Sequence, residues 1–138
     1  MNERKIAARV LDDIETNGAY INIALEKALS EGELKPYEKG FISELVHGVT
    51  ERRITIDYVI SEFSSVKLNK IAPKVLTALR IGVYQLMFMD KVPPSAAVNE
   101  SVKLAKKYGS VSLKKAFNTT KMLFEEALNN EEIPKNPS

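Results

Sequence analysis

Apolar side chains recur every three or four residues along most of this chain, the spacing that places them on one face of an α-helix. The stretch 49–60 is rich in β-branched residues, but it keeps the same helical spacing. Glycine and proline mark the ends of the expected helices, at Gly18, Gly32, Pro36, Pro73, Pro93, Pro94 and Gly109. We therefore predict an all-α bundle of about seven short helices, the last of them over residues 112–128.

One segment differs from the others because it is apolar on nearly every side. Between Val75 and Met89, the main polar interruptions are Thr77, Arg80 and Gln85. A helix that is apolar over most of its surface is surrounded by other helices. We therefore expect the helix near 73–89 to form the centre of the bundle.

Arg80 is the one charged side chain between residues 75 and 89. A guanidinium in a mostly buried position needs a carboxylate partner, because an uncompensated charge in the interior is costly. We predict that Arg80 forms a structural pair with Glu100, and Glu44 is the other candidate.

The charges are distributed unevenly along the chain. Residues 67–121 contain eleven Lys or Arg and two acids, a net charge of +9, whereas the whole chain carries +2, so the rest sums to −7. A basic half beside an acidic half is typical of proteins that bind nucleic acid. The lysines expected to form one patch suited to a phosphate backbone lie on two successive predicted helices: Lys103, Lys106, Lys107, Lys114, Lys115 and Lys121.

Several other functions are not expected from the composition. The chain has no cysteine, which excludes disulfides, thiolate metal sites and cysteine nucleophiles. His47 is the only histidine, so neither a catalytic dyad nor a metal site is predicted. The polar N-terminus lacks the apolar part of a signal peptide, and no apolar run approaches the roughly 18 residues of a membrane span. We therefore expect a cytoplasmic protein that does not contact a membrane.

Three stretches of the sequence resemble a known family. The longest contains LRIGVYQLMFM at 79–89, VP at 92–93 and AAVNESVKLAK at 96–106. The second combines ARVL at 8–11 with GAY at 18–20 and AL at 24–25, and the third is FISELVHGV at 41–49. Together they resemble the NusB-like helical RNA-binding fold, and within it the N-terminal domain of bacterial ribosomal-RNA cytosine-5 methyltransferases of the Sun or Fmu type.

The resemblance implies that residues 1–129 form one NusB-like RNA-binding domain and that 130–138 are a disordered tail or the start of a linker to an absent domain. In such methyltransferases the catalytic cysteines and the S-adenosylmethionine pocket lie in a later domain. The implied function is therefore an RNA-binding module, without catalysis or a cofactor in this chain. It would dock a methyltransferase domain of the same polypeptide on small-subunit rRNA.

The resemblance also leaves a second function open. A free-standing NusB-type transcription antitermination factor would bind RNA together with a ribosomal protein. The two alternatives share the RNA ligand and differ in the protein partner.

The resemblance adds RNA-binding candidates outside the basic segment. NusB-like proteins share a basic RNA-contacting motif on the first helix, which here is Arg4, Lys5 and Arg9. The family also places Arg shortly after the Gly-Val of the third helix, and here Arg52 and Arg53 follow one residue later than that pattern. In the last helix the family's terminal Arg is missing, and only Lys121 could replace its charge.

Overall fold

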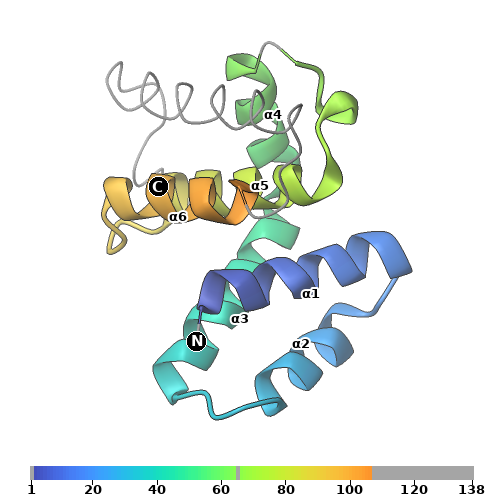
Figure 1. Cartoon of the computed structure of the whole chain (residues 1–138), viewed down its shortest axis with the longest axis vertical. Helices are drawn as coiled ribbons and strands as arrows, with labels where there is room; N and C mark the ends of the chain where they lie inside the picture. The colour runs from blue at the N-terminus through green and yellow to red at the C-terminus, as the bar shows by residue number, and fades with distance from the viewer. Residues whose placement is uncertain (1, 65, 107–138) are drawn as a thin grey trace.

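The computed structural model describes residues 2–64 and 66–106, and these form an all-helical bundle, as predicted (Figure 1). Within this part of the chain there are six α-helices and one short 3-10 helix. Their bounds are α1 Glu3–Asn17, α2 Ile21–Ser30, α3 Pro36–Glu51, α4 Arg53–Phe63, η1 Leu68–Lys70, α5 Pro73–Phe88 and α6 Pro94–Lys106. The predicted helix over 112–128 and the predicted tail over 130–138 lie outside the described residues.

The helix ends follow from local chemistry. The side chain of Asn2 caps α1 by accepting hydrogen bonds from the backbone N–H groups of Arg4 and Lys5 at 3.0 and 3.3 Å. Gly18 ends α1 with a φ of 66°, a left-handed conformation in which an L side chain would be strained. Proline occupies the first turn of α3, α5 and α6, where its missing N–H leaves no helical hydrogen bond unmade.

Helix α5 is the centre of the bundle, which confirms the prediction from its apolar pattern. Every residue from Val75 to Met87 is buried. Helices α1, α3, α4 and α6 pack against α5, and α2 packs against α1 and α3. Figure 1 shows α1, α2 and α3 at one end of the molecule and α4, α5 and α6 at the other.

Each polar side chain buried on α5 has a partner on another helix or on its own backbone. Thr77 donates its hydroxyl to Asp12 Oδ1 of α1 at 2.6 Å. Gln85 Oε1 accepts from Arg4 Nε of α1 at 2.8 Å, and its amide nitrogen donates to the Ile81 carbonyl at 3.0 Å. These bonds prevent the desolvation cost of leaving buried polar groups unpaired.

The predicted partners of Arg80 were wrong. Its Nε and Nη2 donate to the two carboxylate oxygens of Asp57 on α4, at 2.8 and 3.0 Å. Glu100 instead lies 3.6 Å from Lys103 on its own helix, and Glu44 is exposed on α3. The physical reason is that the side chain of Arg80 faces α4, whereas Glu100 of α6 lies near Arg4 of α1.

We expect Asp57→Ala to destabilise the fold by about 2–4 kcal/mol, because it leaves the guanidinium of Arg80 nearly buried without its bidentate acceptor. Because Asp57 is partly exposed, the expected loss of stability is smaller than for a fully buried ion pair. Glu44→Ala, which removes an exposed carboxylate of similar size, should change the free energy of unfolding by less than about 0.5 kcal/mol. Urea unfolding of both variants measures the difference. Equal costs would contradict the assignment of Asp57 as the partner.

A second prediction concerns the crossing of α3 and α5. A methyl group added at Gly48 would overlap the ring of Tyr84, whereas Gly40 on the same helix has open space around it. We expect Gly48→Ala to destabilise the fold by about 1–3 kcal/mol through overpacking. Gly40→Ala should stabilise it by up to about 1 kcal/mol, because alanine favours a helix. Thermal melts of the two variants should therefore shift in opposite directions.

Candidate nucleic-acid interface

Six exposed lysines come from the part of the basic segment that the structure describes. Residues 67–106 contain seven bases and two acids, which gives +5. Arg80 is buried and paired, so it contributes little to the surface charge. The exposed side chains are Lys67, Lys70, Lys74, Lys91, Lys103 and Lys106. The predicted contacts Lys107, Lys114, Lys115 and Lys121 lie outside the described residues.

Two of these lysines project from α6. Lys103 and Lys106 are one turn apart and both are exposed, as the sequence predicted for a surface helix. The Nζ of Lys103 lies 3.6 Å from Glu100 Oε1, and this exposed pair adds little stability. Both ammonium groups can therefore move to meet a phosphate.

The N-terminal arginines of α1 differ in their surroundings. Arg4 is half-buried, because its Nε donates to Gln85 and its guanidinium lies 5.1 Å from the centre of the Phe41 ring. Burial lowers the pKa of Arg4, and the nearby Glu100 acts in the opposite direction. Arg4 thus anchors α1 to α5 and also brings positive charge beside α6. Lys5 is partly exposed on the same turn.

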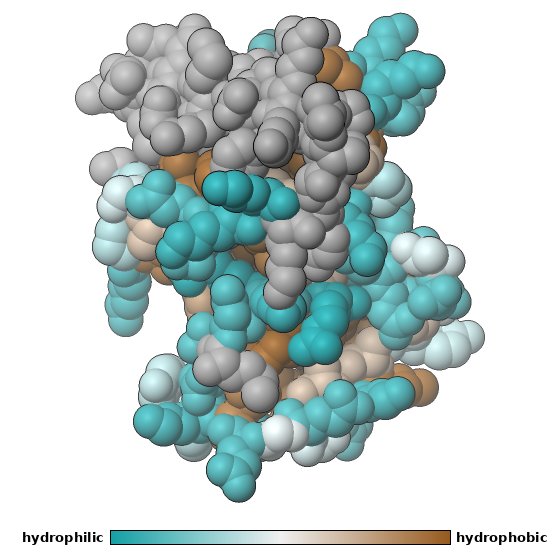
Figure 2. All heavy atoms as spheres, in the orientation of Figure 1, coloured by the Kyte–Doolittle hydropathy of each residue, from teal (hydrophilic) through white to brown (hydrophobic). Residues whose placement is uncertain are grey.

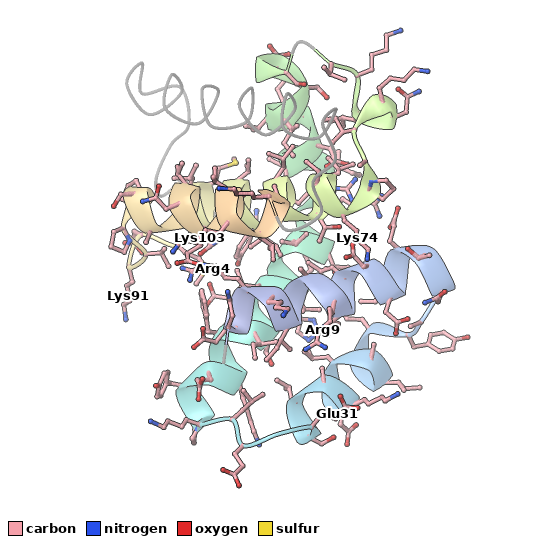
Figure 3. All side chains as sticks on the ribbon, viewed as in Figure 1. Arg4, Arg9, Glu31, Lys74, Lys91 and Lys103 are labelled. Carbon is pink, nitrogen blue, oxygen red and sulfur yellow. The ribbon has the colours of Figure 1, made fainter. Side chains whose placement is uncertain are left out.

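Arg9 is exposed, one turn further along α1. Within residues 2–64 and 66–106 its side chain makes no hydrogen bond, ion pair or ring contact. Its guanidinium is therefore available to a ligand. Helix α1 packs against α6. Figure 3 shows Arg4 and Lys103 where α1 approaches α6, and Arg9 further along α1, on its side toward α2. We call Arg4, Arg9, Lys103 and Lys106 the α1–α6 basic face.

The arginines between α3 and α4 have structural contacts. Arg53 donates through both terminal nitrogens to the carboxylate of Glu15 on α1, with Nη2 2.6 Å from Oε1. This pair raises the pKa of Arg53 and lowers the pKa of Glu15. Arg52 is exposed, and its guanidinium lies 4.7 Å from the centre of the Phe88 ring. The sequence placed both among the RNA contacts. The bidentate bond to Glu15 occupies both terminal nitrogens of Arg53, whereas Arg52 has only the ring contact.

Lys74 and Lys91 are exposed bases that were not among the predicted RNA contacts. Lys74 lies in the first turn of α5, and its charge acts on Asp12 of α1. Lys91 lies in the connection between α5 and α6, and Figure 3 labels both side chains in the same view as Arg4 and Lys103. The signal that could have identified them was the scarcity of acids over residues 67–106.

Two negative findings apply to the described part of the chain. No three of its Asp, Glu and His side chains gather closely enough to hold a metal ion. None of its helices combines the length and the apolar character needed to cross a membrane.

Comparisons with known proteins agree with the helical architecture. The NusB family matches residues 1–119 of this chain. A probable ribosomal RNA small subunit methyltransferase B from Synechocystis sp. is 36% identical over 118 residues, which are 86% of this chain and 26% of that protein. The chain thus spans about a quarter of that relative's length. A transcription antitermination protein NusB from Clostridium novyi is 33% identical over 116 residues, 80% of this chain and 87% of that protein.

A solved structure shares the fold. The crystal structure of antitermination factors NusB and NusE in complex with dsRNA contains a chain that superimposes with a TM-score of 0.78 at 21% identity, covering 91% of this chain and 94% of that one. The match of the family over most of the sequence, together with relatives more than 30% identical, shows that this chain belongs to the NusB family.

Proposed function

We propose that this chain is an RNA-binding module that docks a small-subunit rRNA cytosine-5 methyltransferase on its RNA substrate. The observation that carries the proposal is the α1–α6 basic face, where exposed lysines and Arg9 project from two packed helices. Lysine and arginine on a rigid surface position a nucleic acid through its phosphates. The identity of 36% to a probable small-subunit rRNA methyltransferase supports the choice of substrate.

In this proposal the chain contributes binding and not chemistry. It has no cysteine to attack cytosine. What it contributes is positive charge held on a helix, such as that of Lys103 and Lys106 on α6. Arg4 is fixed by Gln85 and Phe41, so it positions the start of α1 beside α6. A docked RNA would then be held in one orientation relative to a methyltransferase domain.

A second function has its own support. The transcription antitermination protein NusB of Clostridium novyi is 33% identical to this chain, and the fold is shared with a chain of a solved complex of NusB, NusE and dsRNA. A free-standing antitermination factor, binding RNA with a ribosomal protein, therefore remains the alternative. NusE, which accompanies NusB in the solved RNA complex, is the natural probe of this alternative.

The first test measures RNA binding as a function of salt. If about four phosphates are neutralised, the logarithm of the binding constant should fall with the logarithm of salt concentration with a slope of roughly −3 to −4. The double variant Lys103→Ala/Lys106→Ala should make that slope less negative by about two, because each lost phosphate contact removes roughly one unit. Fluorescence titration of a labelled small-subunit rRNA fragment gives both values.

The matched control is Lys35→Ala/Lys39→Ala, which removes the same charge from exposed positions at the start of α3. It should leave the slope close to that of the parent. Loss of affinity in both double variants to the same extent would show that net charge, and not the α1–α6 basic face, determines binding.

The second test distinguishes the two functions. For a methyltransferase docking module, purified NusE should leave the affinity for small-subunit rRNA unchanged. An antitermination factor should bind NusE directly. Its affinity for RNA should rise when NusE is present, because both proteins would contact the same RNA molecule in one complex. RNA titrations with and without NusE measure this difference.

A further inference from the structure

An open groove of about 700 Å³ runs between α1 and α2. Its apolar lining comes from Ile6 and Val10 of α1 and from Ala24 and Ala28 of α2. The two alanines lie one turn apart, and their single methyl groups leave room that larger side chains would fill. In Figure 2, tan and brown atoms are visible between hydrophilic residues in the lower half of the molecule, where α1 and α2 lie. The volume falls in the range of small-molecule sites.

The charges around this groove are balanced. Three bases line it, namely Arg9, Lys27 and Lys74, and so do three acids, namely Asp12, Asp13 and Glu31. Figure 3 shows Arg9 and Glu31 on opposite sides of the groove, on α1 and at the end of α2. A row of phosphates would gain little net attraction here, unlike at the α1–α6 basic face. The groove therefore favours a ligand with an apolar body and polar edges.

The acceptors of the groove are held in place. The carboxylate of Asp13 accepts from Asn17 Nδ2 at 2.7 Å, and that of Asp12 accepts from Thr77 at 2.6 Å. Burial raises the pKa of Asp12. A positioned carboxylate accepts a hydrogen bond from the exocyclic amino group of a nucleobase. The amino groups of cytosine, adenine and guanine would suit these acceptors, and uracil offers none.

Arg9 connects the groove to the α1–α6 basic face, because it belongs to both. Among the described residues its guanidinium has no partner. The guanidinium plane of arginine is a surface on which unstacked bases stack. One side of a bound nucleotide could therefore rest on Arg9 while its phosphate remained over the basic face.

We propose that the α1–α2 groove holds one unpaired, amino-bearing nucleobase of the bound RNA, between the methyl groups of Ala24 and Ala28 and the guanidinium of Arg9. The inference rests on the proposed RNA binding and specifies its ligand. A paired base is unsuitable, because its Watson–Crick edge is already engaged and its faces are covered by neighbouring bases.

The variant Ala28→Leu tests the inference, because it fills the groove without changing any charge. Its affinity for a short single-stranded RNA should fall roughly 5- to 100-fold, the loss of one stacked base. Its affinity for a duplex of the same length should equal that of the parent. In a single-stranded RNA with abasic sites the parent and the variant should bind equally. Thr55→Leu, an exposed change on α4, is the control and should bind every RNA like the parent.

A second variant, Arg9→Lys, keeps the positive charge and removes the planar guanidinium group on which a base could stack. This variant should lose affinity for single-stranded RNA, and the dependence of its binding on salt should be unchanged. Because Arg9 is exposed, the substitution should not affect the stability of the fold. If the parent binds no RNA, the proposed function itself fails. If the parent binds RNA but both groove variants match it, or lose single-stranded and duplex binding equally, the groove inference is overturned. Loss of NusE binding alone on Ala28→Leu would overturn it as well, in favour of a protein ligand.

Discussion

The structure depends on the burial of α5 from Val75 to Met87. A helix enclosed on all sides gains stability from its apolar surface, but each polar group that it carries must find a partner inside the bundle. Thr77, Arg80 and Gln85 meet this requirement through Asp12, Asp57 and Arg4, in addition to the backbone bonds of Thr77 and Gln85. Because these partners lie on α1 and α4, the polar residues of the central helix fix how both outer helices are placed. The crossing of α3 and α5 also requires a glycine at position 48, because a larger residue would overlap the ring of Tyr84.

The two kinds of basic residue have different functions in this arrangement. Of the five arginines, four contact carboxylates, an amide or aromatic rings of other helices: Arg4, Arg52, Arg53 and Arg80. The lysines from 67 to 106 are exposed. Guanidinium is planar, weakly hydrated and suited to paired or stacked positions, whereas ammonium is strongly hydrated and stays in solvent. Arg9 is the exception, since it is an exposed arginine without a partner in the described part of the chain.

This division suggests how a small helical domain can hold RNA in one orientation. In the proposed function, the lysines of α6 would supply charge that acts on any phosphate backbone, which gives affinity without selectivity. The groove between α1 and α2 has no net charge on its rim, so it can discriminate by shape and hydrogen bonding. Arg9 stands between the two regions and Arg4 secures the same helix to the core. Binding through both regions would use α1 as the common element, held by Asp12 as well as by Arg4.

The sequence by itself determined the helices of the described residues, the central position of α5 and the family. Helix ends depend on neighbouring residues such as Asn2, Gly18 and Pro73, and enclosure depends on an apolar pattern that can be counted along one segment. Only the tertiary structure decided that Arg80 pairs with Asp57, that Arg4 bonds to Gln85 and that an open groove is lined by α1 and α2. Several carboxylates suited Arg80 equally well in the sequence, because helical periodicity gives the face of a residue but not the point at which two helices cross.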